Sequence, residues 1–462
     1  MPVSTIKYFI ERRTELNEYI FRYIFSILGV AGEMTDSPAE TEIDIYYGNN
    51  CPNLANTKII IIENPSDFDW QDILTSELDP REIGRVVEFD IIKALSELIT
   101  DNIHSRLPDE AYDQHDRLIY SASFQSYARS DNIALINTYI DFIRKVIEIK
   151  CHIPARRLWP SGKKCAIGLS HDVDIPDDYA CLKRPTFLRS RSLKWNVKNA
   201  LLKCHRSAKY LFDRERNGFW LFSDIMDLEE SLGFKSTFFF AAVNTYHEYG
   251  SKYDVHYSIK DRKFIEVFDE IAKRNFEIGL HASYNAYLNV ERFGQEKRLL
   301  EKIAQIEVKG LRHHLWHMSR DQQRTLKLQE NAGFAYDSSI AFNENMSFRR
   351  NIALPYHPWD DEENHAMNIL ELPVFCMDGN LFYHSNNIDS ALKKLTGFIS
   401  KLKASGGMGV IDWHVRTSYP RNSPFLSWAV CYDKLLKYLS NDREIWVENL
   451  LTLHDWWKGS NH

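Results

Sequence analysis

Short apolar runs alternate with amphipathic stretches through most of the chain after about residue 160. Within one such stretch, residues 263–275 place Phe264, Val267 and Phe268 on one helical face. The apolar runs are of the length and type that a strand buried on both faces needs, and they lie at residues 165–170, 236–240, 276–280, 306–311, 368–372 and 409–413. This alternation predicts an α/β fold with a parallel sheet, either open or closed into a barrel.

The N-terminal part of the chain follows a different pattern. We expect an amphipathic helix over about 6–30, strands at 42–47 and 58–62, and a helix that begins at Asp90. Two prolines and a glycine then interrupt the pattern between residues 151 and 162. We therefore predict a smaller α+β domain of unknown role over 1–153 and a second domain over 154–462.

Composition and charge narrow the class of protein. The 462 residues are 44% hydrophobic and 26% charged, as in an ordinary soluble globular protein. The net charge of -7 argues against a nucleic-acid footprint over the whole chain, so we expect no nucleic-acid partner. Seven cysteines occur without a C-x-x-C pair, which favours reduced thiols over a disulfide framework or a thiolate zinc site. With no signal-peptide pattern and no long apolar run, the sequence predicts a cytoplasmic protein that does not span a membrane.

One basic segment stands apart from this balanced composition. Residues 183–216 are rich in Lys and Arg, and apolar side chains are interleaved with them. Such a stretch is more often a solvated helical face, but it can also lie on an anionic membrane surface. Peripheral membrane association through 183–216 is therefore kept as an alternative, and the sequence leaves the oligomeric state open.

Ionisable side chains collect where the expected strands end. Asp172 and Asp174 follow the run at 165–170, and their spacing in an extended chain points both side chains to one face. Active sites of parallel α/β folds gather at this edge. The side chains that follow the later runs are His281, then Arg312, His313 and His314, and last Asp412, Trp413, His414 and Arg416.

These residue types are those of a metallohydrolase. An aspartate and two histidines can hold a divalent ion with one position left open. The ion lowers the pKa of water and polarises a carbonyl, while a second carboxylate takes the proton from the water. A further histidine can then protonate the leaving amine.

Five short motifs resemble those of the polysaccharide deacetylase family, which is of the carbohydrate esterase type. They read S-H-D-V-D at 170–174, E-I-G-L-H-A-S-Y at 277–284, G-L-R-H-H at 310–314, L-E-L-P at 370–373 and V-I-D-W-H at 410–414. The first is the form found in a subgroup with T-H-D-V-D or S-H-D-V-D and an extra N-terminal domain. The resemblance covers about residues 160–460 and implies a distorted (β/α) barrel.

The same resemblance implies a role for each matching residue. It implies Asp172 as the general base, Arg312 as the residue that orients it, and His414 as the general acid. Asp174 and His281 would be metal ligands.

The third metal ligand departs from the family's pattern. Typical members carry a second histidine four residues after the first, where this chain has Asn285. Either Asn285 binds weakly through its amide oxygen, or His314 comes in from the neighbouring strand end. We favour His314 and a zinc ion, because imidazole suits zinc better than an amide does.

Further side chains are candidates for substrate contacts. Tyr284 and Trp413 could stack on a sugar ring, although each could equally belong to the core. Asn285 and Arg416 could contact polar groups of the substrate. Asp412 or Asp378 could tune His414.

The resemblance and the residues together predict a metal-dependent hydrolase that removes an N-acetyl group from a sugar of a cell-surface polysaccharide or its precursor. A first alternative is a glycan-binding homologue with weakened catalysis, which the missing second histidine favours. A glycosidase is less favoured, because its two carboxyl groups lie about 5–9 Å apart and usually come from different strands, unlike those of Asp172 and Asp174.

Overall fold

The fold is described from a computed structural model of the chain. The description covers residues 4–38, 42–52, 54–64, 80–81, 84–127, 134–154, 156–177, 218–383, 387–420 and 425–460. The basic segment at 183–216 lies outside these residues, so the alternative of membrane association through it stays untested. No helix in the described ranges has both the length and the apolar character that crossing a bilayer requires.

The N-terminal part contains a five-stranded sheet with the order β2-β1-β3-β4-β5. Every pairing in it is parallel, so this unit is built as a parallel sheet with helices packed against it. Its strands are β1 (Thr5–Ile10), β2 (Ala31–Met34), β3 (Ile43–Tyr47), β4 (Thr57–Ile61) and β5 (Val86–Val87). The helices that pack against it are α1 (Glu15–Leu28), α3 (Ile91–Thr100) and α5 (Leu135–Cys151).

The helix expected over 6–30 is wrong in its first part. Strand β1 occupies Thr5–Ile10, and α1 begins only at Glu15. Side chains in β1 are buried at every second residue, which is the period of a strand packed on one face. The Thr14 side chain then accepts a hydrogen bond from the Asn17 N–H and starts the helix.

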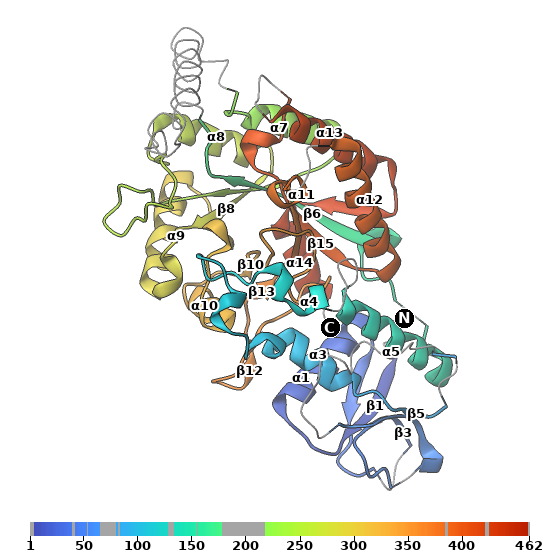
Figure 1. Cartoon of the computed structure of the whole chain (residues 1–462). Coiled ribbons are helices and arrows are strands. Elements are labelled where there is room, and N and C mark those ends of the chain that lie inside the picture. Colours follow the sequence, from blue (N-terminus) through green and yellow to red (C-terminus); the bar gives the residue numbers. More distant parts are fainter. Residues whose placement is uncertain are drawn as a thin grey trace.

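A nine-stranded sheet forms the larger part of the molecule (Figure 1). Its strand order is β13-β10-β9-β8-β7-β6-β15-β14, with β16 paired to β6, and the neighbouring strands are parallel. The bounds are β6 (Cys165–Val173), β7 (Thr237–Phe240), β8 (Glu277–Ala282), β9 (Gly310–His313), β10 (Tyr336–Asp337), β13 (Leu370–Glu371), β14 (Val374–Met377), β15 (Met408–Asp412) and β16 (Ile445–Glu448). The expected α/β class is confirmed, and the short strands β10, β14 and β16 are additional to those expected.

The sheet curls until its two ends nearly meet. The strands at the two ends of the order, β13 and β14, are joined in sequence by only Leu372 and Pro373. Leu372 donates its N–H to the Asp337 carbonyl of β10, while the Pro373 carbonyl accepts the N–H of Val410 in β15. This connection makes the distorted barrel that the family resemblance implied.

Helices cover the outside of the barrel, and one of them begins at the amino end of its strands. α14 (Leu450–Ser460) begins where the Leu450 N–H donates to the Thr237 hydroxyl at 2.9 Å and the Leu451 N–H donates to the Glu277 carboxylate at 2.8 Å. Thr237 and Glu277 are the first residues of β7 and β8, so the opposite, carboxyl end of the barrel stays available for a site. The other helices are α7 (Phe222–Ser231), α8 (Arg262–Lys273), α9 (Val290–Ala304), α10 (Gln322–Asn331), α11 (Asp378–Leu381), α12 (Ile388–Ser405) and α13 (Leu426–Asn441).

The N-terminal sheet and the barrel share a packed interface. The Tyr19 ring in α1 stacks on Trp359 with 5.5 Å between ring centroids, and the Tyr23 hydroxyl donates to the Pro355 carbonyl at 3.1 Å. One hydrophobic cluster continues from the first sheet into the barrel. The chain segment that follows α3, cyan in Figure 1, runs away from the first sheet and lies against the barrel near α10. The domain boundary at residue 153 stays a prediction.

Candidate active site

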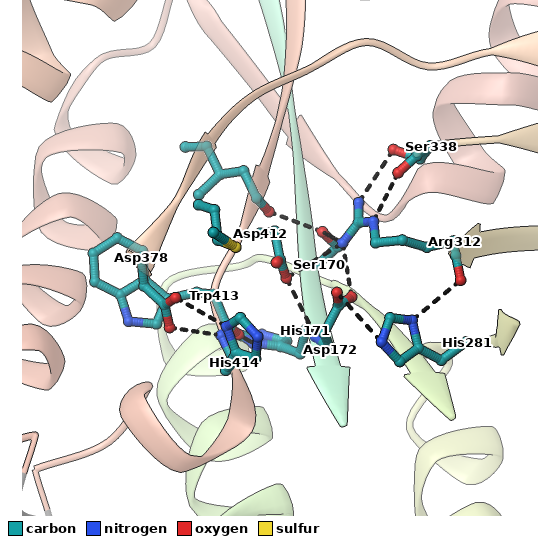
Figure 2. A network of polar contacts seen from close by, with 12 residues as sticks. Ser170, His171, Asp172, His281, Arg312, Ser338, Asp378, Asp412, Trp413 and His414 are labelled. Carbon is teal, nitrogen blue, oxygen red and sulfur yellow. Dashed lines mark hydrogen bonds and ion pairs between the residues drawn. The ribbon is translucent and has the colours of Figure 1, made fainter. Parts of the chain in front are cut away.

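Asp172 lies near the end of β6, where an arginine holds it in place. Arg312 of β9 donates from Nη1 to Asp172 Oδ1 at 3.0 Å and to the Ser170 hydroxyl at 2.8 Å. Its Nε donates to the Ser338 carbonyl at 2.8 Å, so the guanidinium is fixed on both sides (Figure 2). Arg312 is fully buried, and its fork therefore fixes the direction of the Asp172 carboxylate.

Asp174, His281 and His314 come together at the same edge of the sheet, from the ends of β6, β8 and β9. His281 Nε2 lies 3.2 Å from Asp174 Oδ1, and His314 Nδ1 lies 3.3 Å from the same oxygen. The two ring nitrogens are 2.9 Å from each other. Among the described residues, these three form one of two groups of His and Asp side chains whose atoms lie close enough to hold a metal ion.

The outer hydrogen bonds of the His281 and His314 rings determine whether the nitrogens that face Asp174 carry hydrogen. His281 Nδ1 lies 3.1 Å from the Arg312 carbonyl, and His314 Nε2 lies 2.9 Å from the Tyr253 carbonyl. A carbonyl oxygen can only accept, so both of these nitrogens carry hydrogen. In neutral rings, His281 Nε2 and His314 Nδ1 then present lone pairs to each other and to the Asp174 carboxylate.

This arrangement requires a positive charge at its centre. Asp174 Oδ1 is buried and accepts no hydrogen bond from the described residues. Three ligands at about 2.0–2.1 Å from a tetrahedral zinc ion lie about 3.3 Å apart, and the separations of 2.9, 3.2 and 3.3 Å are close to that value. The side chains therefore fit a zinc ion.

The charges of the cluster explain the pKa shifts of its members. Burial raises the pKa of Asp174, but the facing His414, His281 and His314 rings outweigh it and hold that pKa well below its usual range. Burial lowers the pKa of His281, but the Asp172 and Asp174 carboxylates raise it by more. The Asp174 carboxylate thus stays ionised and attracts cations.

His414 faces the cluster from the end of β15. Its Nδ1 lies 2.9 Å from Asp378 Oδ1 and its Nε2 lies 3.1 Å from Asp174 Oδ2 (Figure 2 shows the Asp378 contact). Burial lowers the pKa of His414, but Asp378 and then Asp174 raise it well above its usual value. A histidine held between two carboxylates can carry a proton toward the open side of the site.

Asp412 lies deeper, behind Asp172. Its Oδ1 is 3.3 Å from Arg312 Nη1, and its Oδ2 has no hydrogen-bond partner among the described residues. Burial, followed by the charge of Asp172, raises the pKa of Asp412 to about 7. Asp378 therefore contacts His414 directly, whereas Asp412 shares Arg312 with the expected base.

The expected substrate contacts lie in different surroundings. Arg416 Nη1 donates to Asp174 Oδ2 at 3.3 Å, and its side chain is 19% exposed against 1% for that of His281, so it lies on the open side. Tyr284 is nearly buried, and its hydroxyl lies 2.9 Å from His115 Nδ1. Asn285 is partly exposed at the start of a turn, and its carbonyl accepts a hydrogen bond from Arg292.

The expectation that Trp413 stacks on a sugar ring is wrong. Its side chain is fully buried, its indole N–H donates to the Thr417 carbonyl at 3.2 Å, and its ring packs on Tyr432. A ring with no exposed face cannot stack on a sugar. Trp413 therefore belongs to the core below His414.

Two sets of contacts near the site were not expected. His171 lies 2.6 Å from the Trp413 carbonyl and 2.8 Å from the Glu229 carboxylate, and so ties the strand end that carries His414 to α7. His115 contacts Tyr284, which lies 169 residues later in the chain. Arg117 contacts Leu315, which lies 198 residues later. No local pattern in the sequence indicates contacts between residues so far apart.

Comparisons with known proteins give a distant likeness. No protein-family model and no curated protein matches the chain. A structure described as a polysaccharide deacetylase from Mycobacterium smegmatis is 16% identical over 65% of this chain and 92% of its own, with a TM-score of 0.44. One from Pseudomonas aeruginosa is 15% identical over 66% and 95%, with a TM-score of 0.44.

A third solved structure is described as a pseudoenzyme. It is described as a CE4 family pseudoenzyme from Bacillus anthracis, and it is 11% identical over 64% of this chain and 67% of its own, with a TM-score of 0.33. At these identities and scores no residue role is carried over from any of the three.

Proposed function

We propose that the protein is a zinc-dependent hydrolase that removes an N-acetyl group from a sugar of a cell-surface polysaccharide or its precursor. The observation that carries the metal-dependent part is that His281 Nε2, His314 Nδ1 and Asp174 Oδ1 meet at separations close to those of zinc ligands, while Asp174 Oδ1 accepts no hydrogen bond from the described residues. The choice of an N-acetylated sugar rests on the five motifs that resemble polysaccharide deacetylases.

Asp172 is suited to act as the general base. Arg312 holds Oδ1, which leaves Oδ2 on the side of His281, 3.8 Å from its Nε2. Oδ2 therefore points toward the metal ligands and can take a proton from water bound beside them. When bound, zinc would supply Lewis acidity, which acidifies that water and polarises the acetyl carbonyl.

His414 is suited to act as the general acid. Asp378 holds Nδ1 and accepts a hydrogen bond from the His414 main-chain N–H at 3.0 Å, so the ring and its backbone are oriented together. This leaves Nε2 directed into the site, where it can donate a proton to the departing amine.

The test is acetate release from a panel of N-acetylated oligosaccharides with the zinc-loaded protein. Asp172→Asn should lower the rate by about 10²–10⁴-fold, the usual contribution of a general base, and should leave zinc bound. Asp360→Asn is a matched control, because Asp360 is buried and paired with Lys327 at 2.9 Å outside the site.

Two outcomes would contradict the proposal. Substantial activity of the Asp172→Asn protein would remove the base from its assigned role. Protein that binds glycans but neither holds zinc nor releases acetate would instead be a glycan-binding homologue.

A further inference from the structure

The backbone adopts an unusual conformation immediately after His314. Leu315 and Trp316 have φ angles of 58° and 55°, in the left-handed region that side chains with a Cβ rarely adopt. The His317 N–H donates to the His314 carbonyl at 3.2 Å and closes this turn. Two consecutive non-glycine residues in this region persist only where surrounding contacts hold them.

One of those contacts comes from the N-terminal part of the chain. Arg117 Nη1 donates to the Leu315 carbonyl at 3.0 Å and to Asn343 Oδ1 at 2.9 Å. The other side of the guanidinium is fixed, because Nε and Nη2 donate to Asp113 Oδ2 at 2.8 and 2.6 Å. Asp113 also accepts the main-chain N–H groups of His115 and Arg117, so the loop is rigid where it meets the turn.

The same loop contacts Tyr253, whose carbonyl orients the His314 ring, and the neighbouring Tyr284. His115 Nδ1 lies 2.9 Å from the Tyr284 hydroxyl, and its ring meets the Tyr253 ring edge-on at 5.0 Å between centroids. The Tyr253 carbonyl is the partner of His314 Nε2. Residues 113–117 thus support both the turn after His314 and the carbonyl that decides which ring nitrogen faces Asp174.

We propose that Arg117, held by Asp113, is a positioning residue for the metal ligand His314. This inference rests on the proposed zinc site. A ligand histidine four residues after His281 would be held in position by the end of β8, the strand that carries His281. Here that position is Asn285, and the ligand comes from a strained turn that needs an external support.

The experiment measures the zinc dissociation constant of the full-length protein by competition with a chromophoric chelator. Arg117→Gln removes the guanidinium group that joins Asp113 to the Leu315 carbonyl. It should weaken zinc binding by about 10–100-fold, as is usual when the partner that orients a ligand is lost. The cobalt-substituted Arg117→Gln protein should show altered visible absorption bands, because the geometry of one imidazole ligand changes.

Arg320→Gln is the matched control. Arg320 also joins the barrel to the N-terminal segment, by ion pairs with Asp116 at 2.8 Å and with Asp109, but it does not contact the turn. Its zinc affinity should stay within about twofold of that of the unmodified protein, because the outer support of His314 is intact. Thermal unfolding of both metal-free variants separates general loosening of the interface from loss of the ligand's position.

The inference is overturned if Arg117→Gln and Arg320→Gln bind zinc equally well. If Arg117→Gln does not fold, Asn343→Ala serves instead, because it removes the second acceptor of the same Nη1 group and should also weaken zinc binding. Zinc-free unmodified protein in zinc-containing medium would refute the proposed function itself, which is a different result from equal binding by the two variants.

Discussion

Asp90 and Asp174 both follow a strand of a parallel sheet, one in the N-terminal sheet and one in the barrel. Asp90 accepts hydrogen bonds from the N–H groups of Lys93 and Asn64 and from the Tyr47 hydroxyl, at 3.0, 2.7 and 3.2 Å. Asp174 Oδ1 accepts none from the described residues and faces two imidazole nitrogens. The two carboxylates have similar positions in sheets of the same kind, yet only one has its lone pairs satisfied by donors.

Glu296 shows a third way to accommodate a buried carboxyl group. It lies in α9 and contacts the main-chain N–H and the hydroxyl of Ser283. Burial raises the pKa of Glu296 to about 8, so the folded protein keeps it protonated at neutral pH. Hydrogen-bond donors stabilise the Asp90 carboxylate, a bound proton neutralises Glu296, and, as we propose, a metal ion neutralises Asp174. This difference separates structural carboxyl groups from the candidate site.

The largest effect is expected at Asp174. Asp174→Asn replaces an anionic ligand by a neutral amide, and zinc affinity and acetate release should fall together by at least about 100-fold. Chelator competition and an acetate assay on the same preparation measure both. Loss of activity with undiminished zinc binding would show that Asp174 is not a ligand.

At Asp90 we expect a loss of stability instead. Asp90→Asn turns one acceptor into a donor that faces existing N–H donors, and the free energy of unfolding should fall by roughly 1–3 kcal/mol. Urea unfolding measures this change. Zinc binding should be unaffected, and a large drop in zinc affinity would erase the contrast between the two sheets.

The effect expected at Glu296 is a dependence of stability on pH. Its folded pKa of about 8 exceeds the ordinary value of 4.5, so between these values the folded state holds a proton that the unfolded state releases. Stability should therefore fall as pH rises through this window, by about 1.4 kcal/mol per pH unit from this group. Glu296→Gln should flatten that slope in urea unfolding at several pH values, and an unchanged slope would contradict the account.

The barrel could be predicted from the sequence because its strands are buried on both faces. Residues 165–170 read as a strand for this reason, and they form the first six residues of β6. The first sheet was harder, because 6–30 combines a strand and a helix in one apolar stretch, and short apolar runs do not distinguish the two. The two-residue strand β10 has too little sequence to show any period.

The candidate site could be predicted in part. Asp172, Asp174, His281, His314 and His414 lie together as expected, since strand ends bring them to one edge. Their roles stay predictions. The support from Arg117 joins residues 198 positions apart, and the burial of Trp413 depends on its packing against Tyr432 of α13, so neither leaves a local signal.

The central claim is a zinc ion held by Asp174, His281 and His314. Anomalous diffraction at the zinc edge from crystals of the zinc-loaded protein tests it most directly. The account predicts one strong peak at about 2.0–2.1 Å from Asp174 Oδ1, His281 Nε2 and His314 Nδ1. A peak held instead by Asp172, Asp412 and His414, the second such group in the described chain, or no peak at this strand edge, would contradict it.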